Sequence, residues 1–312
     1  MVSSTADAAL VLEGVTKRYG AFTAVDDLSF TARAGRILGF LGPNGAGKTS
    51  TIRMILGLID PTAGAIRVLG ETQASKVRDR IGFLPEERGL YRRMTPVNAI
   101  AFLAGLKGVP AAEGRRRARA LLESQGLQEA MGRQVRALSK GMAQKVQLLS
   151  AIAHEPDLVI LDEPFSGLDP VNQQALEALI RGLATRGATV VFSTHVMQHA
   201  ERLCDQVVLL AEGKKVFDGT VAQARAAAPR TLMLEGDFEA SAVAELPGVG
   251  ELTVEKGETE HLRVVAALKN GAPAQEALKV AFARGLDVQR FELREPHLHD
   301  AFIVLTSRGG GT

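Results

Sequence analysis

A glycine-rich stretch that ends in a lysine and a threonine carries the most specific chemistry in this sequence. It reads Gly42-Pro43-Asn44-Gly45-Ala46-Gly47-Lys48-Thr49 and continues into Ser50. The spacing is that of G-x-x-x-x-G-K-[ST], in which backbone N–H groups cradle phosphates, the lysine reaches the β- and γ-phosphates, and the hydroxyl binds Mg²⁺. A glycine turn that binds nothing would need neither Lys48 nor Thr49. The sequence therefore predicts a nucleotide site formed by Gly42 to Ser50.

The strand and the helix that this motif requires are both present in the pattern of apolar residues. Ile37–Leu41 is a short apolar run typical of a buried parallel strand. After the motif, Ile52, Ile55, Leu56 and Ile59 recur at helical spacing. The glycines let the backbone curl until its N–H groups converge, and the helix N-terminus adds partial positive charge at the same point.

Polar residues follow two apolar runs later in the chain. Leu158–Leu161 ends in Asp162-Glu163, and a predicted strand at Thr189–Ser193 ends at Thr194-His195. Parallel α/β sheets bind their ligands at the carboxyl ends of the strands, and paired carboxylates there are not core residues. A lone histidine at a strand end is otherwise more often structural. Asp162, Glu163 and His195 are therefore candidates for the chemistry of the nucleotide site.

The remaining pattern predicts an α/β core with subdomains. Short strands near residues 10–12, 28–31 and 66–69 indicate an antiparallel β layer. Residues 96–131 are rich in Ala, Leu and Arg and indicate helices interrupted at Pro110 and Gly114. Because Ser139 is a natural N-cap for a further helix, we expect a helical subdomain over about 96–155.

A change of composition indicates two domains. Residues 222–229 are alanine-rich and end in proline, which predicts a linker between domains at 1–221 and 230–306. The predicted order in the second domain is strand, helix, strand, strand, helix, strand, which fits a small α+β sandwich of ferredoxin-like type. A last helix is expected at 297–305, followed by a flexible tail at 307–312.

The overall composition is that of an ordinary globular protein. The chain has 312 residues, of which 46% are hydrophobic and 23% charged. A formal net charge of +2 argues against a dedicated nucleic-acid binder. Cys204 is the only cysteine, so no intrachain disulfide can form. We find neither a signal peptide nor an apolar stretch of membrane-spanning length, so work at a membrane would require another chain to span it.

The order of these motifs resembles that of the ATP-binding subunits of ABC transporters, over about residues 9–220. The shared elements are the phosphate-binding loop, the Glu86 loop, Leu138-Ser139-x-Gly141, Leu161-Asp162-Glu163-Pro164, Ser166-Gly167-Leu168-Asp169 and His195. The sodium-exporter branch, near the drug exporters, is a narrower resemblance. This narrower resemblance rests on three segments. They are Leu84-Pro85-Glu86-Glu87-Arg88-Gly89-Leu90-Tyr91, Leu138-Ser139-Lys140-Gly141 and the C-terminal segment Glu295-Pro296-His297-Leu298-His299-Asp300-Ala301-Phe302.

The resemblance implies a P-loop NTPase core of the ABC ATPase type, which binds ATP with Mg²⁺. Asp162, Thr49 and Glu86 would hold the metal, and Glu163 would polarise the attacking water. Lys48 and His195 would contact the γ-phosphate. Tyr19 would stack on the adenine ring; a half-buried turn aromatic is the competing interpretation, and stacking does not exclude GTP.

The resemblance also implies partners. Ser139 and Gly141, at a helix N-terminus, would bind the ATP held by a second ATPase subunit. Asp169 would lie at the interface between the two subunits. Two subunits, identical or sister chains, would sandwich two ATP molecules head to tail. An integral membrane permease, a separate chain, would dock at residues 96–131 and the Glu86 loop. The expected location is the cytoplasmic face of the cell membrane, in a bacterium.

Two positions depart from the family pattern. Glu86 stands where most members have glutamine, and it either adds negative charge beside the phosphates or is simply a solvated loop residue. Lys140 and Met142 replace the glycine and the glutamine of the signature around Ser139.

The leading hypothesis is an ATPase subunit that powers an exporter of unidentified substrate. A non-transport ABC ATPase acting on ribosomes or nucleic acid is the alternative, although such relatives usually carry two cassettes or a long coiled-coil insertion. A third hypothesis is a regulatory module in which the C-terminal domain senses a small molecule. The sequence of that domain contains no residues at the spacing typical of metal ligands or of a catalytic nucleophile and its base. We therefore interpret the domain as an accessory to the ATPase.

Overall fold

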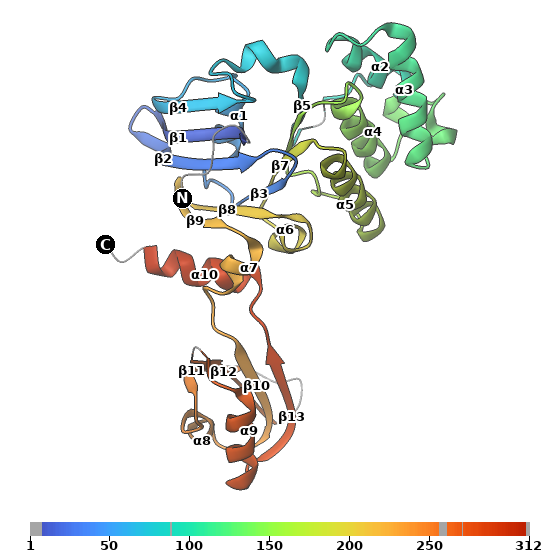
Figure 1. Ribbon diagram of the computed structural model, residues 1–312. Coiled ribbons are helices and arrows are strands. Elements are labelled where there is room, and N and C mark those ends of the chain that lie inside the picture. Colours follow the sequence, from blue (N-terminus) through green and yellow to red (C-terminus); the bar gives the residue numbers. More distant parts are fainter. Residues whose placement is uncertain (1–7, 88, 256–260, 270, 310–312) are drawn as a thin grey trace. The chain divides into compact units, whose positions relative to one another are not determined.

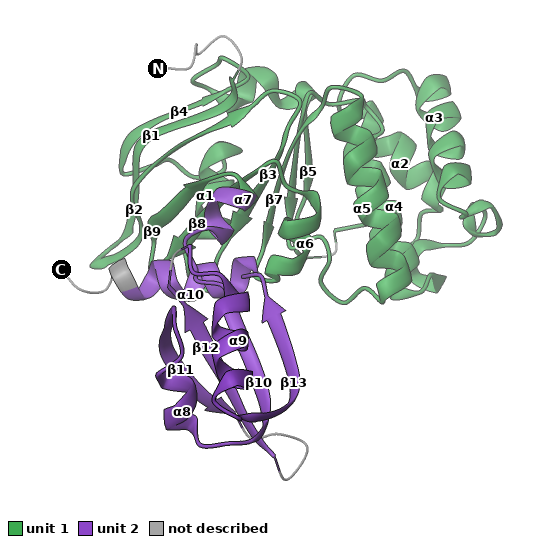
Figure 2. Ribbon diagram, turned by 60° about the horizontal axis from the view of Figure 1, so that its bottom comes forward, with its two compact units in different colours: residues 1–221 green, residues 222–312 purple. Residues whose placement is uncertain are grey.

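A computed structural model describes residues 8–87, 89–255, 261–269 and 271–309 (Figure 1). Arg88 of the Glu86 loop and residues 310–312 of the expected tail therefore lie outside the described residues. The chain divides into two units, residues 1–221 and 222–312 (Figure 2). The change from one unit to the other falls at the alanine-rich stretch of the sequence.

A largely parallel sheet lies at the centre of the first unit. Its strand order is β5-β6-β7-β3-β8-β9, and neighbouring strands are parallel except β8 and β9. The strands are β3 (Ile37–Leu41), β5 (Ile81–Leu84), β6 (Leu158–Asp162), β7 (Thr189–Thr194), β8 (Gln206–Ala211) and β9 (Lys214–Gly219). β3, β6 and β7 are buried along their whole length, which explains their continuous apolar sequences. Since these three strands are parallel neighbours, their carboxyl ends meet at one edge of the sheet.

A second, antiparallel sheet in the order β2-β1-β4 packs on this core. Its strands are β1 (Ala8–Tyr19), β2 (Phe22–Arg33) and β4 (Ala63–Val68). Leu12 and Phe30 of this sheet share a hydrophobic cluster with Phe40 of β3 and Ile52 of the following helix. The expected antiparallel layer is present, but β1 and β2 are much longer than the apolar runs that predicted them. They continue as a hairpin through polar residues, because cross-strand hydrogen bonds do not depend on side-chain type.

The first unit contains some helices beside the central sheet and others farther from it (Figure 1). They are α1 (Lys48–Ile55), α2 (Pro96–Gly105), α3 (Ala111–Ser124), α4 (Lys140–Ile152), α5 (Pro170–Thr185) and α6 (Met197–Leu203), with short 3₁₀ turns η2 (Ala74–Arg80), η3 (Gln128–Ala130) and η4 (Val135–Ala137). α2, α3 and α4 pack against one another. Pro110 separates α2 from α3 as expected, but the predicted break at Gly114 is wrong. Gly114 lies inside α3, where a Cβ would be 3.3 Å from the carbonyl oxygen of Ala101, so the residue permits close helix packing.

The second unit has a sheet in the order β11-β12-β10-β13, in which all neighbours are antiparallel. Its elements are β10 (Thr231–Asp237), α8 (Ala240–Ala244), β11 (Val249–Glu255), β12 (Leu262–Leu268), α9 (Ala274–Ala283), β13 (Asp287–Arg294) and α10 (Leu298–Gly309), preceded by α7 (Val221–Arg225). Leu232, Leu234, Val264 and Ala277 belong to its separate hydrophobic core.

Two parts of the second unit differ from the expected pattern. The stretch interpreted as a linker begins with the short helix α7, since alanine favours helix when no proline interrupts it. α10 continues to Gly309, into the residues expected to be a tail. Among the described residues, we find no helix long and apolar enough to cross a membrane.

Candidate functional site

The glycine-rich loop between β3 and α1 forms a narrow cradle of backbone. A Cβ added at Gly42 would lie 2.4 Å from the carbonyl oxygen of Leu210, and one at Gly47 would lie 2.5 Å from that of Ala24. Gly47 is the N-cap of α1 and has φ 96°, in the left-handed region that favours glycine. Side chains at these two positions would displace neighbouring backbone, so the sequence must be glycine for the loop to close in this way.

The other loop residues have distinct places in this cradle. Pro43, Asn44 and Gly45 are exposed at its outer turn, and Ala46 is buried beneath it. The N–H of Ala46 donates to the carbonyl oxygen of Pro43 at 3.2 Å, which fixes the curl of the turn. Ser50 follows in the first turn of α1, where it is half-buried.

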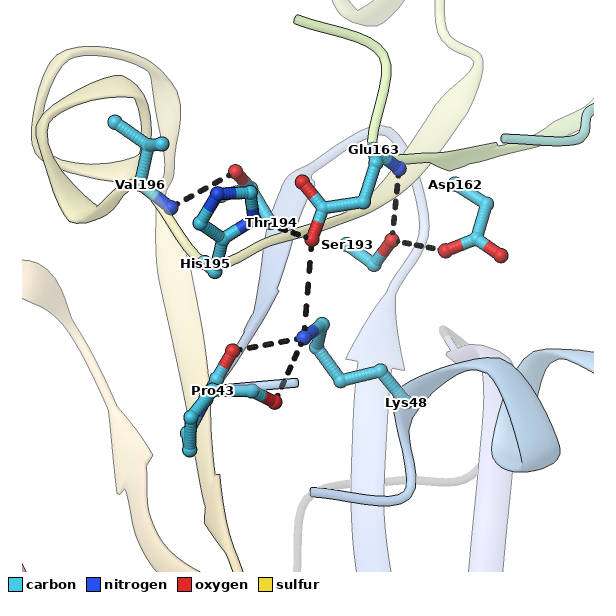
Figure 3. A network of polar contacts seen from close by, with 9 residues as sticks. Pro43, Lys48, Asp162, Glu163, Ser193, Thr194, His195 and Val196 are labelled. Atoms are coloured by element: carbon cyan, nitrogen blue, oxygen red, sulfur yellow. Dashed lines mark hydrogen bonds and ion pairs between the residues drawn. The ribbon is translucent and has the colours of Figure 1, made fainter. Parts of the chain in front are cut away.

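Lys48 is a buried cation inside the loop. Its ammonium donates to the carbonyl oxygens of Gly42 at 2.7 Å and of Pro43 at 3.1 Å, and its side chain is 6% exposed (Figure 3). Burial lowers the pKa of Lys48, while the carboxylates of Glu163, Asp162 and Glu86 oppose that shift. The nitrogen lies 3.7 Å from Oε1 of Glu163. The loop therefore holds a buried ammonium that is paired with a carboxylate from the end of another strand.

Ser193 joins the two acidic residues that end β6. Asp162 and Ser193 are register partners on the parallel strands β6 and β7. The Ser193 hydroxyl donates to Oδ1 of Asp162 and accepts from the backbone N–H of Glu163 at 3.0 Å (Figure 3). Since Ser193 is fully buried, these bonds fix both the carboxylate of Asp162 and the direction in which the chain leaves the strand.

Glu163 turns back toward the phosphate-binding loop in a rare backbone conformation. Its φ is 46°, in the left-handed region that non-glycine residues seldom adopt, at a cost of about 1–3 kcal/mol. Oε1 of Glu163 lies 3.0 Å from Nδ1 of His195, which follows directly after β7. Its side chain is 9% exposed, whereas that of His195 is 49% exposed. The carboxylate is thus held between the Lys48 ammonium and an imidazole open to solvent.

Asp162 and Thr49 carry oxygen atoms beside the loop that could serve as metal ligands. Burial raises the pKa of Asp162, while hydrogen bonds from Ser193 and Thr49 and the charge of Lys48 oppose that shift. Mg²⁺ is usually held by one or two carboxylates and hydroxyls together with substrate phosphates and water. The pair Thr49 and Asp162, next to a cradle that only glycines permit, fits a polyphosphate with its Mg²⁺.

Glu86 lies two residues after the end of β5 and borders the same region. A cavity of about 210 Å³ is lined by Glu86, Lys140, Asp162 and Glu163, among other residues. Glu86 acts on the charge of Lys48, since it is one of the carboxylates that raise the lysine pKa. Glu86 is therefore placed at the candidate site rather than on an unrelated part of the loop surface.

The signature residues are placed at a second helix N-terminus. Ser139 caps α4, and its hydroxyl accepts from the N–H of Met142 at 3.2 Å. A Cβ added at Gly141 would lie 3.0 Å from the side-chain nitrogen of Asn172 in α5. Asp169 caps α5 and accepts from the N–H of Asn172 at 3.0 Å, which lowers the pKa of Asp169. Gly141 and Asp169 therefore both lie against Asn172, while Ser139 caps the helix that carries Gly141.

Tyr19 lies at the end of β1, with its side chain 47% exposed. The Lys17 ammonium is 5.3 Å from the centre of its ring. A cation near the face of an exposed aromatic ring adds only a small stabilising energy. The ring is therefore available for stacking.

Sequence reasoning missed three residues that organise the site. Ser193 could have been found as the residue opposite Asp162 in a parallel register, and Asn172 as the partner of the cap residue Asp169. The third is His199, whose imidazole stacks on Phe165 with centroids 4.0 Å apart and contacts Glu177 at 3.4 Å. His199 follows His195 by four positions and lies in α6, a proximity that could have drawn attention to it.

The arrangement as a whole can hold a nucleotide polyphosphate and direct a water at it. The backbone cradle and Lys48 neutralise phosphate charge, Thr49 and Asp162 offer ligands to Mg²⁺, and Glu163 offers a fixed carboxylate oxygen. The site is built from four separate parts of the chain: the loop after β3 and the residues that follow β5, β6 and β7.

Comparisons with known proteins agree with this geometry. Residues 25–166 match the family model described as ABC transporter. An uncharacterized ABC transporter ATP-binding protein, YhaQ of Bacillus subtilis (strain 168), is 37% identical over 94% of this chain and 97% of its own length. The Nod factor export ATP-binding protein I of Paraburkholderia xenovorans (strain LB400) is 35% identical over 97% of this chain and 98% of its own. A solved ATP-binding subunit of an ABC transporter superposes with a TM-score of 0.65, at 34% identity over 70% of this chain and 92% of its own.

Proposed function

The chain belongs to the family of ABC transporter ATP-binding proteins, and from this premise we propose that it is the ATP-hydrolysing subunit of an exporter. The observation that carries the proposal is the position of the Glu163 carboxylate, 3.7 Å from the Lys48 ammonium and 3.0 Å from the His195 imidazole. A carboxylate held there lies between the phosphate-binding loop and open solvent, where a water must attack. Full-length similarity to a protein named for Nod factor export supports export as the direction of transport.

In the proposed reaction, the glycine cradle and Lys48 bind the phosphates of ATP. Thr49 and Asp162 would hold Mg²⁺, which would supply positive charge beside the phosphates. Glu163 orients a water and accepts its proton as the water oxygen bonds to the γ-phosphorus and the bond to the β–γ bridging oxygen breaks. His195 keeps the carboxylate in place and contacts the γ-phosphate. Tyr19 stacks on the adenine ring.

The second ATPase subunit completes the site. Ser139 caps α4, and Gly141 in the first turn of that helix lies against Asn172 of α5. A helix N-terminus that offers N–H groups and a hydroxyl is suited to a γ-phosphate on a facing subunit. We infer that this subunit and an identical or sister subunit enclose two ATP molecules in a head-to-tail dimer. Asp169 lies at the interface between the two subunits. Closure on ATP and opening after hydrolysis would move the attached membrane subunits.

The membrane subunit is a separate permease that docks beside the helical subdomain, about residues 96–155. A cavity of about 320 Å³ is lined by Leu90, Arg92, Val135, Arg136 and Leu138, with further residues of α4. Nearby, Tyr91 and Phe102 are exposed and meet edge to face at 5.4 Å. Leu106 of the same stretch is 66% exposed, so it is not a core residue. An apolar helix with acidic residues suits this surface, and docking of a permease there supports a location at the cytoplasmic face of a bacterial membrane.

The finer features of the C-terminal unit also belong to this proposal. The order strand, helix, strand, strand, helix, strand with the sheet order β11-β12-β10-β13 supports a ferredoxin-like assignment. Together with the C-terminal motif Glu295–Phe302, this topology supports assignment of the chain to the branch near the sodium and drug exporters. We infer that this unit is an accessory domain, from residue 230 to the end of α10.

ATP-dependent dimerisation of the Glu163→Gln variant tests the proposal. Removal of the carboxylate should trap ATP, so light scattering after size exclusion should show a larger assembly with Mg-ATP than without nucleotide. Glu129→Gln, an exposed carboxylate in η3, is the matched control and should behave as the wild type. Hydrolysis by Glu163→Gln at the wild-type rate would contradict the assigned role. Affinity for RNA that falls steeply with salt would instead favour the nucleic-acid alternative.

A further inference from the structure

The outer edge of β13 has no partner strand in the described part of the second unit. β13 is the last strand in the order β11-β12-β10-β13, so it pairs on one side only, with β10 (Figure 1). Its sequence is Asp287-Val288-Gln289-Arg290-Phe291-Glu292-Leu293-Arg294. An edge strand presents a row of N–H and C=O groups that can pair with another strand.

Apolar side chains of β13 reach the surface on one face of the sheet. Leu293 and Phe291 are register partners of Leu232 and Leu234 in β10, and both β10 residues are fully buried core residues. Partners directly opposite on adjacent strands point to the same face. Yet Phe291 is 53% exposed and Leu293 45% exposed. The hydrophobic face of this sheet therefore continues to an edge that nothing described in this unit covers.

Charged side chains of β13 occupy the other face. Arg290, Glu292 and Arg294 alternate with the apolar residues, so they point away from the core. Within one chain, Arg294 donates to Glu292 at 3.2 Å. Arg290 has Glu235 of β10 as its register partner.

Charge restricts how β13 could pair with β13 of a second copy. In a continuous antiparallel sheet, opposite charges facing each other stabilise the pair and like charges destabilise it. A two-fold axis at Arg290 would set two arginines against each other, and an axis at Glu292 would oppose two glutamates. An axis at Phe291 sets each Arg290 against a Glu292 of the other copy, on both sides of the axis. Axes nearer either end would pair only part of the strand.

We propose that two copies of this chain join through β13, antiparallel and centred on Phe291, to form one continuous sheet. The two Phe291 rings then meet on the core face, where aromatic cross-strand pairs stabilise a sheet. Two Arg290–Glu292 pairs form on the opposite face. The interface requires no nucleotide, so it is a contact additional to the ATP sandwich and does not depend on it.

Sedimentation velocity of the full chain without nucleotide tests this interface. The wild type should show a reversible monomer–dimer equilibrium over a concentration series. Arg290→Glu and Glu292→Arg each turn two attractive pairs into repulsive ones, and each should weaken the dimer by about tenfold or more. An equimolar mixture of the two variants should restore it, because each chain then offers the charges that the other requires.

Glu251→Arg provides the matched control, since it reverses an exposed charge on the opposite edge strand β11 and should leave the equilibrium unchanged. A wild type that stays monomeric at every concentration would overturn the proposal. A dimer that persists in both Arg290→Glu and Glu292→Arg would also overturn it. So would a mixture of these two variants that fails to dimerise.

A disulfide in a Cys204→Ser background tests the register separately. Phe291→Cys places the new thiol opposite its own copy, so mild oxidation should give a covalent dimer without nucleotide. Leu293→Cys, its matched control, lies two residues from the axis and does not face its own copy, so it should not cross-link. Cross-linking by Leu293→Cys but not by Phe291→Cys would overturn the register centred on Phe291.

Discussion

Oε1 of Glu163 lies 3.0 Å from Nδ1 of His195, although 32 positions separate them in the sequence. Each residue follows the end of a buried parallel strand, β6 for the glutamate and β7 for the histidine. The contact arises because neighbouring parallel strands end at the same edge of the sheet. This contact fixes the position of the Glu163 carboxylate, to which we assign the orientation of the attacking water.

This contact predicts that His195 acts through the same step as Glu163. Glu163→Gln should lower kcat by about 10²–10⁴-fold, the usual contribution of a positioned general base. His195→Ala should lower kcat with less effect on KM, and the double variant should be no worse than Glu163→Gln alone. ATPase rates of all three variants at saturating Mg-ATP check this. Additive losses in the double variant would show that the two residues act separately.

Ser193 should be important for stability as well as for activity. Ser193→Ala removes the bond to the Asp162 carboxylate and leaves the Glu163 N–H without its acceptor, both in a buried setting. An unsatisfied buried polar group costs about 1–3 kcal/mol. Urea denaturation should show a loss of that order. Ser124→Ala, an exposed serine at the end of α3, should change the free energy of unfolding by much less.

His154 should make the protein sensitive to mild acid. Burial lowers its pKa to about 4 from 6.5, and Nδ1 has no hydrogen-bond partner among the described residues. The unfolded chain therefore takes up a proton before the folded one, so stability is complete above pH 6.5 and falls as the pH decreases toward 4.

The expected loss from this one histidine is about 2 kcal/mol between pH 7 and pH 5. His154→Gln should reduce the difference in unfolding free energy between these two pH values by that amount, whatever its effect at pH 7. His299→Gln, an exposed histidine of α10, is the control. An unchanged pH dependence in His154→Gln would show that the histidine is not responsible.

Glu86 should weaken nucleotide binding through its charge. It lines the cavity that Asp162 and Glu163 also line, and its carboxylate acts on Lys48. Glu86→Gln removes one negative charge near the phosphates, so the Kd for Mg-ATP should fall several-fold, most clearly at low ionic strength. Equilibrium binding with a fluorescent ATP analogue measures this. Glu87→Gln, the adjacent loop residue, should have little effect; weaker binding by Glu86→Gln would indicate that the carboxylate is a metal ligand instead.

The sequence predicted much of the fold because its signals are local. The loop from Gly42 to Thr49, the apolar runs of β3 and β6 and the Ser139 cap each depend on neighbouring residues only, and each is found where the pattern places it. The prediction failed at Gly114, where the helix continues. A glycine there reflects contact with Ala101 of α2, a tertiary relationship that the local pattern does not contain.

What the sequence determined by itself was the chemistry on offer: a phosphate-binding loop, two acidic residues at a strand end and a histidine at another. Local spacing also determined the strand–loop–helix order that makes the loop work. Only the tertiary structure decided how these groups meet. The parallel register of β6 and β7 places Ser193 between Asp162 and Glu163 and turns the Glu163 carboxylate toward His195 and Lys48. Backbone hydrogen bonds between strands set that register, and its partners, such as Asp162 and Ser193, lie 31 positions apart, beyond the reach of any local pattern.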